Sequence, residues 1–215
     1  GRLHVYLPPD YDKGKNYPVL YLIHGSGDDD EAWPGVGRAG FILDNLIAAG
    51  KAKPMVVVFP NGGDQPKVSD PEKDPFTAEL LTVIIPYIEA KFRVSKLPED
   101  RALAGLSMGG GQTLNIGLTH TQQFRYLGVF SAGWNSNNQK FFEEKYGKTL
   151  SQDAARLKLI WFGYGTTDQG RPNAQNVEKM FDGYGIKYQS EVTPGGHVWA
   201  NWRLYLSQFA PLLFR

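Results

Sequence analysis

The sequence predicts an α/β protein with a mostly parallel central sheet and helices on both of its faces. Strand-like and helix-like runs alternate along the whole chain, which favours parallel strands joined by helical crossovers. The run at 54–62, PMVVVFPNG, is continuously apolar, as in strands that are covered on both sides. The length of 215 residues suits one α/β domain, and we expect a single domain over 1–215.

The first half of the chain gives the first units of this pattern. Strands are expected at 3–9 and 18–25, separated by a turn region rich in Pro, Asp, Gly and Asn. A helix is expected at 41–50, which closes on glycine as helix ends often do. Residues 77–92 carry apolar side chains at helical spacing, and Pro86 predicts a kink there because proline lacks a backbone N–H.

The second half continues the alternation without an internal repeat. Further strands are expected at 101–106, 126–133, 157–165 and 187–194. Further helices are expected at about 108–120, around 173–184 and at 199–214. The first residues already resemble a strand and a turn, so we expect the chain to be an N-terminally trimmed piece of a longer protein.

Composition and charge exclude several classes of function. The formal net charge is +1 and no block of Lys or Arg occurs, so we expect no nucleic-acid partner. No apolar run approaches the ~18–20 residues of a membrane-spanning helix, so we expect no membrane partner. The absence of cysteine excludes disulfides, thiolate metal sites and cysteine nucleophiles.

A serine lies at the junction between the strand at 101–106 and the helix that follows it. Gly105, Ser107 and Gly109 form a G-x-S-x-G pattern. Between a strand and a helix, this pattern is typical of the nucleophile elbow of α/β-hydrolases, in which small flanking residues permit a sharp, strained turn. We expect the glycines at 105 and 109 to avoid collisions there, and those at 110 and 111 to let the helix pack closely.

A serine hydroxyl needs a base to take its proton. His197 follows the last predicted strand, where an α/β-hydrolase carries its base. The other three histidines fit less well. His4 lies in the first strand, His24 belongs to an early turn that it is expected to support, and His120 ends the helix that Ser107 begins.

An acid must orient the imidazole, and in this order of residues it falls between the serine and the histidine. Asp168 lies directly after the penultimate predicted strand and meets that requirement. Asp153, expected to start or cap a helix, and Asp182, inside or at the end of one, are weaker alternatives.

The oxyanion of a tetrahedral intermediate needs backbone donors. We expect one from the N–H of Met108, directly after the serine, and another from the turn at Gly25 or Ser26.

Three other motifs match nucleotide, phosphate or cation sites only in part. Residues 35–40, GVGRAG, match a dinucleotide fingerprint but follow no strand. Residues 147–149, GKT, lack the first glycine of a phosphate loop, since Phe142 stands in its place. Residues 28–31, DDDE, are expected to form a hydrated acidic loop in preference to a cation site.

Several longer segments extend the pattern beyond these motifs. They are VYLPPDYDKGKNYPVLYLIHG, DNLIAAGKAKPMVVVFPNG, AGLSMGGGQTLNIGLTH, SAGWN and GGHVWANWRLYLSQFAPLLF. Together they span nearly the whole chain, which resembles the first family of carbohydrate esterases, the feruloyl and acetylxylan esterases. The likeness is strongest to the feruloyl-esterase modules attached to xylanases.

This resemblance implies an α/β-hydrolase fold, no metal or organic cofactor, and an acyl-enzyme mechanism on Ser107, Asp168 and His197. It also implies a feruloylated xylan or oligosaccharide substrate, fused xylanase or carbohydrate-binding domains, and an extracellular, secreted enzyme. One departure is that the first strands the family has upstream of Arg2 are missing. The loop 62–75 is a candidate wall of the substrate groove, although it is not a family signature.

Three tryptophans are candidates to stack on a flat aromatic acyl group. Trp134 follows the strand after the elbow, Trp33 follows the oxyanion loop, and Trp199 comes two residues after the proposed base. Core packing is the alternative for all three, and the favoured one for Trp199.

The sequence thus predicts a serine carboxylesterase acting on feruloyl esters of arabinoxylan. An acetylxylan esterase is the main alternative. An acyltransferase, an S-formylglutathione hydrolase and a non-catalytic carbohydrate-binding module on the same scaffold are weaker ones.

Overall fold

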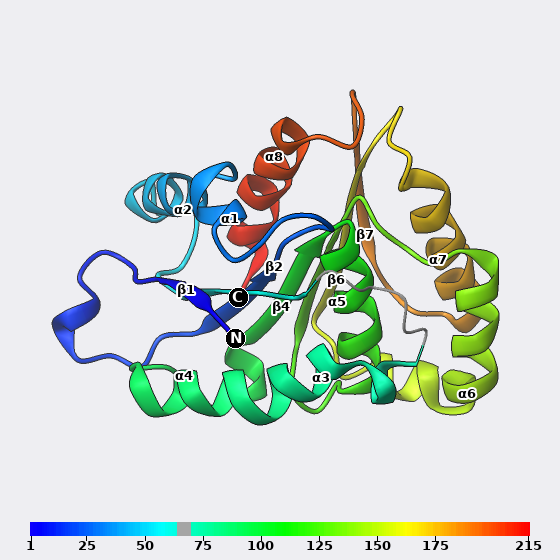
Figure 1. The fold of residues 1–215 in the computed structure, drawn as a ribbon, viewed down its shortest axis with the longest axis horizontal. Helices are drawn as coiled ribbons and strands as arrows, with labels where there is room; N and C mark the ends of the chain where they lie inside the picture. Colours follow the sequence, from blue (N-terminus) through cyan, green and yellow to red (C-terminus); the bar gives the residue numbers. More distant parts are fainter. Residues whose placement is uncertain (64–69) are drawn as a thin grey trace.

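A computed structural model describes residues 1–63 and 70–215. A seven-stranded sheet with the order β1-β3-β2-β4-β5-β6-β7 forms its centre (Figure 1). The strands are β1 (Leu3–Tyr6), β2 (Val19–Ile23), β3 (Val56–Pro60), β4 (Arg101–Leu106), β5 (Tyr126–Phe130), β6 (Leu159–Gly165) and β7 (Gln189–Thr193). Neighbouring strands are parallel except for the edge pair β1 and β3, which is antiparallel. The mostly parallel sheet expected from the sequence is therefore confirmed.

Helices occupy most of the connections between strands. They are α1 (Ala32–Gly35), α2 (Ala39–Ala48), α3 (Pro75–Glu79), α4 (Ile85–Lys91), α5 (Met108–Thr119), α6 (Ser136–Ala154), α7 (Arg171–Tyr184) and α8 (Trp199–Phe209). Short 3-10 turns lie at Tyr11–Lys13, Pro71–Lys73, Pro98–Asp100 and Ala210–Leu212.

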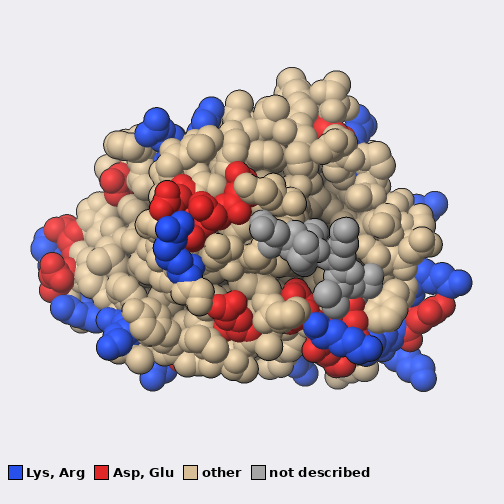
Figure 2. Space-filling view, in the orientation of Figure 1, with Lys and Arg blue, Asp and Glu red and all other residues tan. Residues whose placement is uncertain are grey.

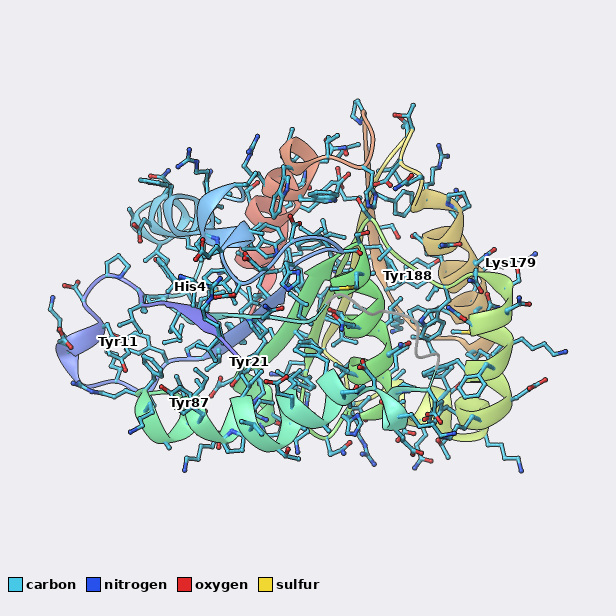
Figure 3. The ribbon with its side chains drawn as sticks, in the orientation of Figure 1. His4, Tyr11, Tyr21, Tyr87, Lys179 and Tyr188 are labelled. Carbon is cyan, nitrogen blue, oxygen red and sulfur yellow. The ribbon has the colours of Figure 1, made fainter. Side chains whose placement is uncertain are left out.

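Two hydrophobic clusters cover the two faces of the sheet, because successive strand side chains point to opposite sides. In β2, for example, Tyr21 belongs to the cluster under α3 to α7, whereas Leu20 and Leu22 belong to the cluster under α1, α2 and α8. Figure 1 shows α1, α2 and α8 grouped on one side of the sheet. Figure 3 shows Tyr21 in the packed interior, with Tyr87 of α4 and Lys179 of α7 at the outside.

The segment predicted as one kinked helix at 77–92 contains a wider turn instead of a simple kink. A π-helical turn, Leu80–Ile84, joins α3 to α4, and Pro86 lies at the start of α4. Because Pro86 has no N–H to donate, its place in the first turn of α4 costs little.

One long helix was not predicted from the sequence. Helix α6 has 19 residues, but its buried residues are Phe142, Leu150 and Ala154 alone, so its apolar pattern is sparse. Asn135 caps its start by accepting a hydrogen bond from the Asn138 N–H at 2.9 Å. Asp153 therefore lies in the last turn of α6, and the expectation that it starts or caps a helix is wrong.

The carboxyl ends of the central strands bring several loops to one edge of the sheet, as parallel strands require. The loops after β4, β5, β6 and β7 carry Ser107, Ser131, Asp168 and His197.

On the face of the molecule that Figure 2 shows, Lys and Arg side chains are interspersed with Asp and Glu side chains.

Candidate active site

Ser107 occupies a strained turn between β4 and α5. Its φ of 51° and ψ of −115° lie outside the regions that non-glycine residues normally adopt. The Ser107 N–H donates to the Phe130 carbonyl at the end of β5, at 2.8 Å, which ties the turn to the neighbouring strand. Strain of this kind persists only where the surrounding structure enforces it, and it is concentrated at functional sites.

The glycines around Ser107 permit this turn by close backbone contact. A Cβ added to Gly109 would lie 2.5 Å from the His24 carbonyl oxygen, and one on Gly110 would lie 2.5 Å from Ala132 Cβ. A Cβ on Gly111 would meet nothing within 4 Å among the described residues. The expected close packing is therefore confirmed for Gly110 and wrong for Gly111.

The structure brings the three predicted catalytic side chains into one hydrogen-bonded line. His197, in the turn between β7 and α8, has its Nε2 at 2.9 Å from Ser107 Oγ. Its Nδ1 lies 2.8 Å from Asp168 Oδ1. Because a carboxylate can only accept, the proton belongs on Nδ1, and Nε2 is left to accept the Ser107 hydroxyl proton.

The Asp168 carboxylate is buried and receives several donors. Oδ1 accepts from the Gly170 N–H at 2.7 Å as well as from His197, and Oδ2 accepts from the Ser131 hydroxyl. Burial alone raises the pKa of Asp168, but the hydrogen bonds from His197, Ser131 and Gly170 together lower it below its ordinary value. The group is thus held as the carboxylate that the imidazole needs.

Two residues around Asp168 were missed by the sequence reasoning. Ser131 lies directly after β5 and has a φ of 53°, and the Trp202 indole of α8 donates to its hydroxyl at 2.9 Å. The Trp202 ring also packs edge-on against His197, with ring centroids 5.1 Å apart. The position of Ser131 in the sequence could have identified it, since it follows a strand at the same sheet edge as Ser107 and Asp168.

Backbone contacts join the loop of Asp168 to the loop of His197. The Thr166 N–H donates to the Thr193 carbonyl at 2.8 Å, and the Thr167 N–H donates to the Gly195 carbonyl at 3.0 Å. A Cβ on Gly165 would lie 2.0 Å from the Gly195 carbonyl oxygen, so this approach requires glycine. Asp168 and His197 are therefore held by a shared backbone frame.

The predicted oxyanion donors lie next to the serine. Met108 begins α5, directly after Ser107. On the other side, a Cβ added to Gly25 would lie 3.6 Å from Ser107 Cβ, which places the Gly25–Ser26 turn beside the serine. His24 braces this turn: its ring hydrogen-bonds the Gly25 carbonyl at 2.8 Å and accepts from the Gly62 N–H at 3.0 Å.

Two of the three predicted tryptophans are packed in the core. Trp33 is 1% exposed and donates to the Ile23 carbonyl at 3.1 Å, and Trp134 is 3% exposed and donates to Asn115 at 2.9 Å. Neither ring offers a face to a ligand, which corrects the expectation that they stack directly on an acyl group. Trp199 is half-buried, edge-on to Trp33 and Trp202.

The remaining histidines and aspartates lie apart from this line. His120 is at the opposite end of α5 from Ser107, where burial lowers its pKa. His4 pairs through Nδ1 with Asp30 at 2.7 Å. Asp182 lies in α7 and accepts from the Tyr188 hydroxyl at 3.0 Å.

The acidic run at 28–31 is not simply a hydrated loop. Asp30 is buried, and its two oxygens accept from Arg2 Nε at 3.1 Å. Asp29 and Glu31 also pair with Arg2. In residues 1–63 and 70–215, no group of three or more His, Cys, Asp or Glu side chains is arranged to hold a metal ion.

The two nucleotide-like motifs have structural roles. Residues 35–40 run from the last residue of α1 into the start of α2, and a Cβ on Gly37 would lie 2.6 Å from the Trp33 ring. Residues 147–149 lie inside α6 with no strand before them. In the loop 62–75, positions 64–69 fall outside the described residues, so its suggested role as a groove wall stays a prediction.

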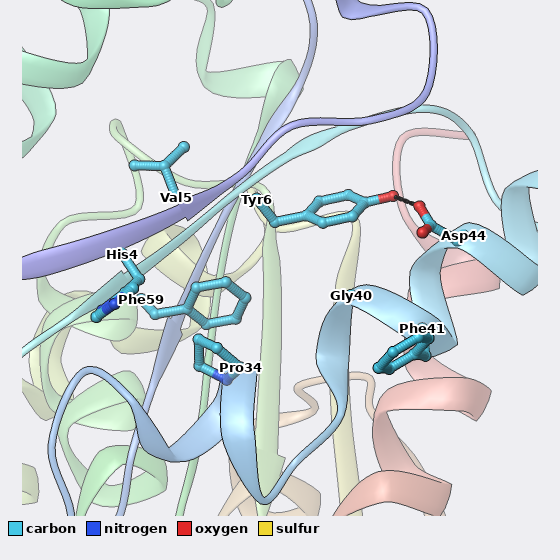
Figure 4. Close-up of a pocket in the computed structure, with 8 residues that line it drawn as sticks. All are labelled: His4, Val5, Tyr6, Pro34, Gly40, Phe41, Asp44 and Phe59. Carbon is cyan, nitrogen blue, oxygen red and sulfur yellow. Dashed lines mark hydrogen bonds between the residues drawn. The ribbon is translucent and has the colours of Figure 1, made fainter.

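A pocket of about 310 Å³ lies beside the edge strand β1 (Figure 4). Tyr6, Phe41, Asp44 and Phe59 are among its lining residues, and the Tyr6 hydroxyl donates to Asp44 at 2.6 Å. Its lining comes from β1, β3, α1 and α2, and it includes none of Ser107, Asp168 and His197. No helix in the described part of the chain has the length and apolarity of a membrane span.

Comparison with known proteins gives the family of the chain. A family model described as putative esterase matches residues 2–213. The chain is 37% identical over 99% of its length to an endo-1,4-beta-xylanase/feruloyl esterase of Xylanibacter ruminicola, of which it covers 29%. It is 33% identical over 99% of its length to endo-1,4-beta-xylanase Y of Acetivibrio thermocellus, of which it covers 22%. The chain thus spans less than a third of the length of either relative.

A solved structure of a ferulic acid esterase superposes on the chain with a TM-score of 0.85 and 29% identity. The match covers 98% of this chain and 90% of that one. The resemblance stated from the sequence motifs is confirmed by these findings. The chain belongs to the esterase family, and its fold is the α/β-hydrolase fold.

Proposed function

We propose that the chain is a serine carboxylesterase that hydrolyses feruloyl esters on arabinoxylan-type polysaccharide. The observation that carries the proposal is the hydrogen-bonded line from Ser107 through His197 to Asp168. The substrate class is supported by the printed names of similar proteins, a xylanase/feruloyl esterase and a ferulic acid esterase.

The first half of the reaction forms an acyl-enzyme. His197 Nε2 takes the hydroxyl proton as Ser107 Oγ attacks the ester carbonyl carbon, and the carbonyl oxygen becomes an oxyanion. The N–H groups of Met108 and of the Gly25–Ser26 turn donate to that oxyanion. When the intermediate collapses, the bond to the sugar oxygen breaks, and His197 returns the proton to the leaving alcohol.

The second half repeats these steps with water as the nucleophile. His197 removes a proton from the water, which attacks the acyl carbon, and Ser107 leaves with the proton that the imidazole returns. Through both halves the ionised Asp168 holds the imidazole in one orientation and stabilises it while it carries two protons.

Trp199 is the tryptophan that we assign to the acyl side of the site. It is half-buried and lies two residues from His197, and we expect its exposed part to contact an aromatic acyl group. Fusion to xylanase or carbohydrate-binding domains and an extracellular place of action are part of the same proposal. They fit a polymeric substrate, and the two curated relatives are named as xylanases.

The test compares purified protein on methyl ferulate and on a short acetyl ester. We expect hydrolysis of methyl ferulate with the higher kcat/KM, and loss of activity to a trace in Ser107→Ala. A preference for the acetyl ester would overturn the substrate assignment. More than a trace of activity on methyl ferulate in folded Ser107→Ala would overturn the mechanism itself.

A further inference from the structure

Asp168 is held on both of its oxygens, and the donor to Oδ2 is not part of the catalytic line described above. That donor is the hydroxyl of Ser131, which is 2% exposed. The Ser131 backbone is fixed as well, because its N–H donates to the Gly163 carbonyl in β6 at 2.7 Å. Ser131 therefore links the ends of β5 and β6 at the point where the acid leaves the sheet.

The direction of the hydrogen bonds around Ser131 is determined by chemistry. An indole N–H can only donate, so the 2.9 Å contact from Trp202 Nε1 makes Ser131 Oγ an acceptor. A carboxylate can only accept, so the single hydroxyl proton of Ser131 goes to Asp168 Oδ2. Trp202 thus fixes the orientation of the hydroxyl that fixes the acid.

The backbone of Ser131 is strained, like that of Ser107. Its φ of 53° is a left-handed value that glycine adopts without steric cost and serine does not. A glycine would satisfy the backbone here but would supply no hydroxyl. The presence of serine at this position is explained if the hydroxyl has a task.

We propose that Ser131, oriented by Trp202, is a positioning residue that holds the carboxylate of Asp168 in line with His197. The inference rests on the proposed function, since it concerns the activation of Ser107. Without the donor on Oδ2, the carboxylate is held through Oδ1 alone, by the Gly170 N–H and His197, and rotation about its Cβ–Cγ bond would misalign the contact to His197.

The variant Ser131→Gly tests the proposal because it removes the hydroxyl and suits the left-handed backbone. We measure the rate at which a fluorophosphonate labels Ser107, together with kcat and KM on the preferred ester and the unfolding midpoint. We expect labelling and kcat to fall by about 10- to 100-fold, the range for a lost hydrogen bond to a buried charge. KM is expected to change little, because the proposed role of Ser131 is to position Asp168 and not to bind the ester. The unfolding midpoint is also expected to change little, because relief of backbone strain offsets the lost hydrogen bond.

A matched control is Tyr205→Phe. The Tyr205 hydroxyl is buried on the same helix as Trp202 and hydrogen-bonds Thr193 at 2.7 Å, but it is not a donor to Asp168. We expect this variant to be labelled at the unaltered rate. Labelling of Ser131→Gly at the unaltered rate, or an equal slowing in both variants, would overturn the positioning role. Absence of labelling in the unaltered chain would instead overturn the proposed function.

The role of Trp202 is tested by combining variants. Trp202→Phe removes the indole donor and keeps an aromatic ring near His197. As a single variant, Trp202→Phe should slow the labelling of Ser107. Combined with Ser131→Gly it should add no further slowing, because Trp202 acts on Asp168 through the Ser131 hydroxyl, a relay that the glycine has already removed. Effects that multiply in the double variant would overturn the relay from Trp202 through Ser131.

Discussion

Gly105 and Gly109 lie in direct backbone contact, so that a Cβ on Gly105 would lie 2.3 Å from the carbonyl carbon of Gly109. The chain leaves β4 and folds back into α5 within four residues, and it leaves no room for a methyl group on the inner side of the turn. The hydroxyl of Ser107 owes its place at the sheet edge to this contact.

The glycines of this stretch are expected to respond in opposite ways to alanine. Gly109→Ala would drive a methyl group into the His24 carbonyl and should abolish folding or activity. A methyl group on Gly111 would meet no atom of the described residues within 4 Å, so Gly111→Ala should stabilise the chain by roughly 0.5–1 kcal/mol, since alanine is the better helix former. Urea unfolding of Gly111→Ala and soluble yield of Gly109→Ala check this. A destabilised Gly111→Ala would show that the glycine has another role.

Asp168→Asn keeps the size of the acid but removes its charge. An amide can present its NH₂ to Nδ1 and so favour the wrong imidazole tautomer, which leaves Nε2 unable to accept the serine proton. We expect kcat on methyl ferulate to fall by roughly 10³–10⁴ with KM little changed. Steady-state kinetics on the folded variant measure this. A loss below tenfold would contradict the assignment of Asp168 as the acid.

The buried carboxylate of Asp30 should contribute to the free energy of unfolding in a way that depends on pH. Burial raises the pKa of Asp30, but hydrogen bonds from Arg2 and His4 outweigh it and hold the pKa below its usual value. A carboxyl whose pKa is lower in the folded chain stabilises the fold above about pH 4, and this contribution is lost as the pH falls through the folded value. Asp30→Asn should therefore destabilise the chain by about 1–3 kcal/mol near neutral pH.

The difference in the free energy of unfolding between Asp30→Asn and the unaltered chain should narrow as the pH is lowered below about 4, because the Asp30 carboxylate becomes protonated. Urea unfolding at a series of pH values measures it. A difference that stays constant through this range would show that the contribution of Asp30 does not depend on its charge.

Trp33→Phe separates packing from substrate binding. The substitution removes the hydrogen bond to the Ile23 carbonyl and leaves a cavity beside Phe130 and Trp199. We expect a loss of about 1–3 kcal/mol in the free energy of unfolding, with at most a small rise in KM for methyl ferulate through the neighbouring Trp199. A raised KM without loss of stability would restore Trp33 as a substrate contact.

The sheet and the catalytic line were predictable because both follow from local patterns. Apolar runs identify β2 to β6, which are buried throughout. Parallel strands then place the loops after β4 and β6 at one edge, where Ser107 and Asp168 lie. Each residue of the proposed catalytic line also directly follows a strand or the turn after it, so sequence order was enough to predict that the three side chains meet.

The remaining features depend on contacts that no local pattern records. Helix α6 is held at three buried positions in 19 residues, too few to show an amphipathic period. The pairing of Asp30 with Arg2 and His4 joins positions 26 or more apart. The burial of Trp134 depends on its partner Phe142 in α6, the helix that was missed, with ring centroids 4.3 Å apart.

The backbone link between the segments after β6 and β7 has a consequence for redesign. Because Gly165 abuts Gly195 and Thr167 donates to Gly195, the stretches bearing Asp168 and His197 behave as one cassette. Grafting either stretch from a homologous scaffold would break the shared frame, whereas exchanging both together would carry the imidazole and its carboxylate over intact. Such an exchanged pair of segments would then have to be aligned with the turn that carries Ser107, so that the contact between His197 Nε2 and Ser107 Oγ is kept.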